Sequence, residues 1–278
     1  MGLKASPGGQ ALLLEGYRVE VIELATLADV PADCAVVAIV APERGFLPGE
    51  SAALVRHAQG GGRALVMLEP AAEAEPRALL DAWQVRTPPG EVLDARGRIG
   101  SAQGPSGAAI VNRYTQHPLT ASLDGTRMTL FSGARTLATG SADVRGIVWA
   151  GKGAIVLPSA PEPGAGTAPL PPDGQLPLVL AGRRETPGGE ARIVVFGDSD
   201  PARNAGLGMV YNEDLVLNAI RWLADGEAPA AIRPKQRRLY QYPLQPDAVL
   251  TRSQSLALLV PQALLMMGVW TWWRRRRL

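Results

Sequence analysis

Cysteine and histidine are scarce in this sequence of 278 residues. Cys34 is the only cysteine, which excludes an internal disulfide and a zinc site built from cysteines. His57 and His117 are the only imidazoles that a catalytic triad could use, and neither lies in a recognisable triad motif. No G-x-x-x-x-G-K-S/T segment is present, so the chain is not a P-loop ATPase. The sequence therefore predicts no cofactor, no metal and no catalytic residue.

Basic charge is also lacking over most of the chain. The net charge is +2, and the four arginines from Arg274 to Arg277 contribute more than this excess. The other residues are slightly acidic in sum, so no basic surface for a nucleic acid is expected. No nucleic-acid partner is predicted.

Apolar runs alternate with helical patterns in the first part of the chain. "AVVAIVAP", which starts at Ala35, and "RALVMLEP", Arg63 to Pro70, are typical of strands buried on both faces. A helix is expected between them from Pro48 to Gln59, and a strand from Arg18 to Leu24 before them. This alternation predicts an α/β fold with an open, mostly parallel sheet and helices on both faces.

Short β-like segments such as "AAIVNRY" and "GIVWAG" follow, and they predict a β-rich insertion or additional strands at the sheet edge. Later, "LPLVLAGRR" and "ARIVVFGDSD" predict a β-hairpin that turns at Pro187, Gly188 and Gly189. Glu213 to Ala224 has the spacing of an amphipathic helix.

Two carboxylates and a hydroxyl, Asp198, Ser199 and Asp200, follow the apolar strand "RIVVF". One interpretation is a ligand, metal or acid–base site, because open α/β sheets bind ligands at the carboxyl ends of strands. The other is a turn in which these side chains hold backbone groups, and it is favoured because Asp and Ser often do this. His117, in "QHPLT", has the same two interpretations, and its position before a proline favours the turn.

The C-terminus contains the longest apolar run, "LALLVPQALLMMGVWTWW" from Leu256 to Trp273. As a helix it would be about 27 Å long, close to the ~30 Å hydrocarbon core of a bilayer. The sequence therefore predicts a transmembrane helix at 256–273 in the bacterial inner membrane. A linker at 229–255 would join it to an extracytoplasmic domain at 1–228, and 274–278 would be a cytoplasmic tail. The residues expected at the lipid interface are Trp270, Trp272, Trp273, Arg274, Arg275, Arg276 and Arg277.

Several segments together resemble a known family. They are the stretch from "VPADCAVVAIV" to "RALVMLEP", then "TQHPLT", then "ARIVVFGDSDPARNAGLGMVYNEDLVLNAIRWLADGE", and finally "AIRPKQRR" and "WWRRRR". The chain is similar in these to the auxiliary family of ABC transport systems that includes the gliding-motility protein GldG. The resemblance implies a glutamine-amidotransferase-like or flavodoxin-like sheet, and ABC permease and ATPase subunits as partners. Members of the family are usually longer at the N-terminus, so the domain at 1–228 is expected to be truncated.

The sequence and the resemblance together predict a membrane-anchored, non-enzymatic auxiliary component that binds a partner protein or a ligand outside the cytoplasm. An amidotransferase-like nucleophile would be a cysteine after a central strand, and "AIVAPERG" contains none. The alternative is an anchored α/β hydrolase or carbohydrate-binding enzyme that uses Asp198 and Asp200. A truncated sheet should also leave an apolar edge near Arg18–Leu24 or Ala35–Val40, where the chain would associate with itself.

Overall fold

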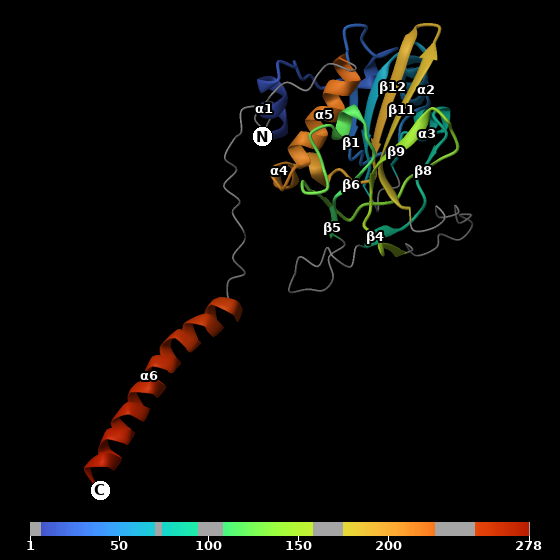
Figure 1. The fold of residues 1–278 in the computed structure, drawn as a ribbon. Coiled ribbons are helices and arrows are strands. Elements are labelled where there is room, and N and C mark those ends of the chain that lie inside the picture. The colour runs from blue at the N-terminus through green and yellow to red at the C-terminus, as the bar shows by residue number, and fades with distance from the viewer. Residues whose placement is uncertain (1–6, 70–73, 94–107, 158–174, 226–247, 278) are drawn as a thin grey trace. The chain divides into compact units, whose positions relative to one another are not determined.

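The computed structural model describes residues 7–69, 74–93, 108–157, 175–225 and 248–277 (Figure 1). The chain divides into two compact units, Met1–Ile232 and Arg233–Leu278. The predicted linker at 229–255 falls mostly outside the described residues. The two units are described separately below.

A six-stranded mixed sheet forms the centre of the first unit, in the order β1–β2–β12–β11–β9–β6. The strands β1, β2 and β12 run parallel to one another, whereas the pairs β12–β11, β11–β9 and β9–β6 are antiparallel. The strand bounds are Val37–Val40 (β1), Arg63–Met67 (β2), Arg113–Tyr114 (β6), Val144–Trp149 (β9), Pro177–Thr186 (β11) and Gly189–Phe196 (β12).

The prediction of a mostly parallel sheet is wrong, and the hairpin explains why. Its two strands, β11 and β12, pair from Thr186 and Gly189 at the turn to Val179 and Phe196 at the other end. The two strands of a hairpin are necessarily antiparallel, and this hairpin lies at the centre of the sheet. The strands on its far side, β9 and β6, are also paired in antiparallel fashion. The hairpin itself was expected from the turn residues and is confirmed.

The described residues in the middle of the chain form three two-stranded sheets, β10–β4, β3–β8 and β5–β7. Their strands are Val85–Arg86 (β3), Glu91–Leu93 (β4), Ala108–Val111 (β5), Thr129–Ser132 (β7), Ala138–Thr139 (β8) and Ile155–Leu157 (β10). One of these strands, β7, ends beside the candidate site described below.

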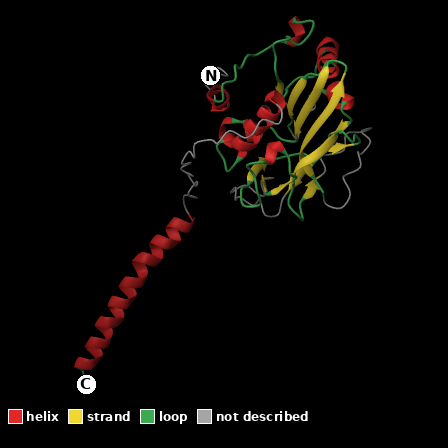
Figure 2. Cartoon of the chain, turned by 45° about the horizontal axis from the view of Figure 1, so that its top comes forward, coloured by secondary structure: helices red, strands yellow, loops and turns green. Residues whose placement is uncertain are grey.

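Helices lie on both sides of the large sheet (Figure 2). Alternate side chains of β2 and β12 enter two separate cores, as expected from the period of two along a strand. Val66 and Val195 pack in the core that contains Leu54 of α2, and Met67 and Phe196 in the core that contains Leu215 of α5. The helices of this unit are Pro7–Leu14 (α1), Pro48–Gln59 (α2), Arg77–Ala82 (α3), Asn204–Leu207 (α4) and Asn212–Asp225 (α5).

The C-terminal end of α5 is held by two arginines from neighbouring strands, Arg63 at the start of β2 and Arg192 within β12. Arg63 Nη1 donates to the Ala224 carbonyl and Arg192 Nη1 to the Trp222 carbonyl, each at 2.6 Å. Arg63 and Arg192 are register partners in the β2–β12 ladder. Cations are favourable at this end of a helix because its last carbonyls carry partial negative charge.

Replacing Arg192 by glutamine should lower the free energy of unfolding by about 2–3 kcal/mol, because it leaves the Trp222 carbonyl and Glu190 without their buried cation. Arg183→Gln is the matched control. Arg183 also pairs with Glu190, at 2.5 Å, but its side chain is 49% exposed against 8% for Arg192. An exposed pair should contribute less than about 1 kcal/mol. If urea unfolding shows that the two variants lose the same free energy of unfolding, the prediction is contradicted.

The second unit contains α6 (Ala248–Arg276). Pro261, Gln262 and Thr271 interrupt its apolar run. Within the described residues, no helix combines the length and the hydropathy needed to cross a membrane. This finding overturns the predicted transmembrane helix at 256–273 and, with it, the predicted inner-membrane localisation.

Candidate functional site

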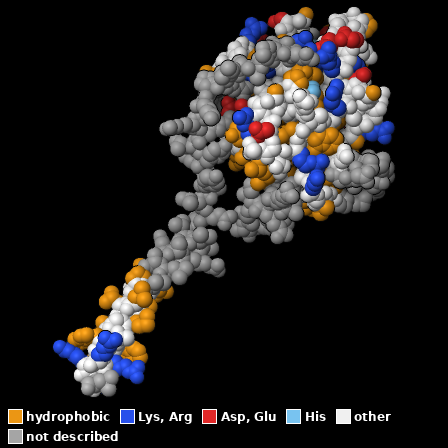
Figure 3. All heavy atoms as spheres, in the orientation of Figure 1, with side chains coloured by type: hydrophobic (Ala, Val, Ile, Leu, Met, Phe, Trp, Pro, Cys, Tyr) orange, Lys and Arg blue, Asp and Glu red, His pale blue; other side chains and the backbone are white. Residues whose placement is uncertain are grey.

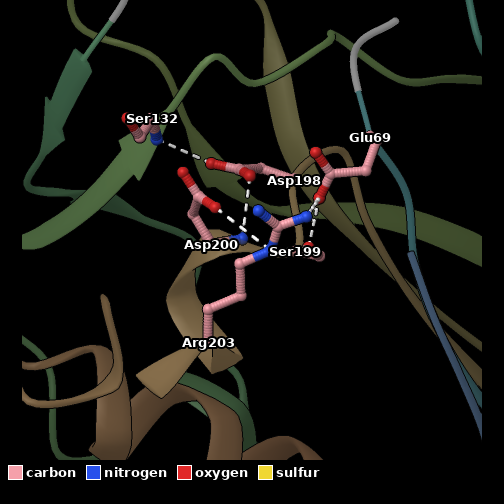
Figure 4. A network of polar contacts seen from close by, with 6 residues as sticks. All are labelled: Glu69, Ser132, Asp198, Ser199, Asp200 and Arg203. Carbon is pink, nitrogen blue, oxygen red and sulfur yellow. Dashed lines mark hydrogen bonds and ion pairs between the residues drawn. The ribbon is translucent and has the colours of Figure 1, made fainter. Parts of the chain in front are cut away.

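Two neighbouring parallel strands end in carboxylates at the same edge of the sheet. Glu69 follows β2 and Asp198 follows β12, and the last residues of these strands, Met67 and Phe196, are register partners. Asp200 begins the short 3-10 helix Asp200–Ala202 that comes next. Carboxylate oxygens of Glu69, Asp198 and Asp200 all lie within 4.8 Å of one another (Figure 4). This is the edge at which open α/β sheets place ligand groups.

Asp198 is fully buried and holds two backbone segments together. Its Oδ2 accepts from the Ser132 amide at 2.6 Å, and its Oδ1 accepts from the Asp200 amide at 2.9 Å. The pKa of Asp198 is raised to about 7, chiefly by burial and also by the charges of Asp200 and Glu69, while the two amide bonds act to lower it. Asp198 therefore joins the end of β7 to the turn after β12.

Arg203 forms ion pairs with the other two carboxylates. Its guanidinium lies 3.0 Å from Glu69 and 3.4 Å from Asp200, and its Nε donates to Ser199 Oγ at 3.1 Å. Ser199 Oγ in turn donates to Glu69. The dashed contacts in Figure 4 thus form one closed network.

A divalent cation would have to compete with existing contacts in this cluster. The carboxylates are the hard oxygen donors that Mg²⁺ and Ca²⁺ prefer. However, both oxygens of Asp198 already accept amide bonds, and Arg203 already pairs with Glu69 and Asp200. These contacts define a polar latch, which consists of Glu69, Asp198, Ser199, Asp200 and Arg203.

Neither histidine takes part in the latch. His57 Nε2 accepts from the Arg63 amide at 3.2 Å, and burial lowers the pKa of His57. His117 Nδ1 accepts from the Leu119 amide at 3.2 Å, and its ring meets Trp222 edge-on with centroids 4.9 Å apart. Burial, with the charges of Arg145 and Arg192, lowers the pKa of His117 to about 4. The structure thus brings Asp198, Ser199 and Asp200 together and places His117 elsewhere, at the start of the short 3-10 helix Pro118–Thr120.

Sequence reasoning missed Glu69 and Arg203. Glu69 ends the run "RALVMLEP", and a carboxylate directly after a second buried strand was an available signal. Arg203 lies in "GDSDPARN", only three residues after Asp200, with which it forms an i,i+3 ion pair. Glu69 could not be joined to the motif without knowing that β2 and β12 are neighbours, whereas the contacts of Arg203 with Ser199 and Asp200 are local.

The tryptophans and arginines expected at a lipid interface pair with one another along α6. Arg274 lies over the Trp270 ring at 5.5 Å, and Arg276 over Trp272 at 4.5 Å. Arg277 lies over Trp273 at 3.6 Å. Figure 3 shows the resulting mixture of apolar and basic side chains at this end of the helix.

The comparison with protein families gives a match over residues 10–148, half of the chain. The matching model is described as "ABC-type uncharacterized transport system" and represents auxiliary proteins. The chain belongs to this family. Membership makes it an auxiliary component of an ABC-type transport system. The matched residues include Glu69 but end before Asp198, so the family match leaves the roles of the latch residues open.

A solved structure supports the fold. The chain is similar to the mmIFT52 N-terminal domain, with a TM-score of 0.59 and 14% identity, over 82% of this chain and 95% of that one. At this identity the likeness concerns the fold alone. No curated protein matches the chain.

Proposed function

We propose that this family member is a non-catalytic binding component, which assembles with the permease and ATPase subunits of its ABC-type transport system. Within the family it would belong to the GldG-type branch. Residues 1–228 would form the binding domain, and the polar latch would hold the turn after β12 in place.

The observation that supports a binding role is that Ser199 Oγ and both oxygens of Asp198 are already engaged in hydrogen bonds within the latch and to β7. A hydrolase needs a nucleophile, a base within reach and donors for the developing oxyanion. Ser199 is fully buried, its hydroxyl is bonded to Glu69 and Arg203, and both histidines bond to backbone amides elsewhere. Cys34 is no better, because its thiol donates to the Val36 carbonyl at 3.4 Å and burial raises its pKa.

One observation favours the alternative, an α/β hydrolase or carbohydrate-acting enzyme. Asp198, with a pKa of about 7, lies beside two other carboxylates, and glycosidases use such a pair as acid and base. A glycosidase carboxyl must reach the scissile bond, however, and Asp198 is fully buried with both oxygens engaged. Its position suits a structural role better.

The two functions differ in how they respond to Ser199→Ala and Asp200→Asn. Each variant should support transport within about twofold of the wild type, per amount of protein accumulated, in cells whose own copy is deleted. An enzyme that used these groups would lose about 100-fold or more, the usual scale for a nucleophile or acid–base residue. Transport and immunoblot abundance are measured together. A variant that is folded and abundant but inactive would overturn the non-catalytic proposal.

A further inference from the structure

A group of arginines lies on the face of the large sheet that α5 covers. Arg145 of β9 is the register partner of Ala181, whose side chain packs in the core that contains Leu215 of α5. Arg183 follows Ala181 by two residues in β11, and Arg192 of β12 is the register partner of Arg183. Residues opposite one another in a ladder, and residues two apart in a strand, share a face of the sheet. Three neighbouring strands therefore each bring one guanidinium group to this face.

His117 belongs to the same group. The β6–β9 register continues past the end of β6, because the Thr115 amide donates to the Ile147 carbonyl at 2.8 Å. The backbone of His117 is also extended, and two further residues along this register place His117 opposite Arg145. Trp222 of α5 meets the His117 ring edge-on, which puts His117 on the α5 face as well.

Two hydrogen-bond donors of this group are unused. His117 Nδ1 accepts from the Leu119 amide, so the neutral ring carries its proton on Nε2. Among the described residues, nothing accepts from this Nε2–H, and the exposed Arg145 side chain has no hydrogen bond or ion pair. Arg192 is buried beside them, with its guanidinium 5.2 Å from the centre of the Trp222 ring.

The group carries an excess of positive charge. Glu190 pairs with both Arg183 and Arg192, so one carboxylate faces these two arginines, and Arg145 adds a third positive charge. Next to burial, the charges of Arg145 and Arg192 are what lower the pKa of His117. His117 is therefore neutral at pH 7, and its Nε2–H points to a ligand that accepts hydrogen bonds and is attracted by the arginines.

We propose that Arg145 and His117 bind the terminal phosphate of a small phosphate monoester. A guanidinium fork can donate to two phosphate oxygens at once, and the histidine Nε2–H can donate to a third. A monoester has three terminal oxygens and a charge of roughly −2 near neutral pH, whereas a diester or a carboxylate offers two oxygens and a single charge. The inference goes beyond the proposed assembly with transporter subunits and does not depend on it.

The test follows the two imidazole rings by NMR in the full chain labelled at histidine, with methyl phosphate added at pH 7 and constant ionic strength. The signals of His117 should shift and saturate. His57, in α2 on the other side of the sheet, should not shift and so serves as the internal control. Bound phosphate should also raise the pKa of His117, because a neighbouring anion favours the charged ring.

Variants and other anions make the test specific. Arg145→Gln should weaken the binding of methyl phosphate by about tenfold or more, the scale of a lost charge-assisted pair. Arg44→Gln is the matched control: Arg44 is also exposed, follows β1 at the opposite edge of the sheet, and should leave binding unchanged. Dimethyl phosphate and acetate should bind at least tenfold more weakly than methyl phosphate.

Each other outcome counts against the proposal. Equal binding of dimethyl phosphate would mean that the site does not use three oxygens. Equal shifts of His57 and His117, or equal weakening by the two arginine variants, would mean that the anion binds to the general charge of the protein. If the His57 signals show a folded chain and those of His117 do not move, the inference is overturned. None of these results bears on copurification with the transporter, so the two proposals fail separately.

Discussion

Gly197→Ala is expected to lower the free energy of unfolding by about 3 kcal/mol or more, the upper range for overpacking a buried site. A Cβ at Gly197 would lie 2.1 Å from the Arg135 carbonyl oxygen, and this neighbour is backbone and cannot rotate away. Gly197 also donates to the Leu178 carbonyl and accepts from the Arg135 amide. The added methyl would therefore separate segments that meet just ahead of Asp198.

Gly208→Ala is the control for this prediction. Gly208 ends α4 on the same stretch of chain, and a Cβ there would meet nothing within 4 Å. Its φ of −77° suits alanine. Urea unfolding should show little change for this variant. If Gly197→Ala is as stable as Gly208→Ala, the packing described at the end of β12 is wrong.

The pH dependence of stability should carry opposite contributions from Asp198 and His117. The folded pKa of Asp198, about 7, lies above its ordinary value of 3.8. The contribution of Asp198 to the free energy of unfolding is therefore fully present below about pH 4. It decreases by up to about 4 kcal/mol as the pH rises through 7. The folded pKa of His117, about 4, lies below 6.5, so its contribution is present above pH 6.5 and is lost as the pH falls through 4.

Two variants separate these contributions. For Asp198→Asn, the stability of the wild type minus that of the variant should fall steadily from pH 4 to pH 7. At low pH the variant should be weaker by about 1–3 kcal/mol, because an amide nitrogen cannot accept the second backbone bond. For His117→Asn, the same difference should rise from pH 4 to pH 6.5. Urea unfolding at a series of pH values measures both, and flat difference curves would contradict the burial assigned to these groups.

Local patterns predicted the local elements well. The helix Pro48–Gln59, the strand in "RALVMLEP" and the hairpin around Gly188 all depend on contacts between residues close in sequence, and all are confirmed. Strand order depends on contacts between distant segments. The central position of the hairpin, and hence the mixed sheet, could not be derived from periodicity.

The contacts of the candidate site are likewise partly local and partly between segments distant in sequence. Asp198 bonds to the Asp200 amide within one turn, which is the local role expected of such a motif. The long-range contacts of the motif join Asp198 to the Ser132 amide and Ser199 to Glu69, over 66 and 130 residues of sequence. The interpretation of Asp198, Ser199 and Asp200 as a turn or a ligand site stays a prediction, as does the role of His117. The variants above distinguish the two.

The measurement that bears most directly on the proposed function is purification of the tagged full chain from cells that contain its transport system. The permease and ATPase subunits should copurify in a fixed ratio to the chain, and should do so equally with Ser199→Ala, since no catalysis is involved. An intact, abundant chain that brings down neither subunit would contradict the proposal that it is a binding component of the transporter.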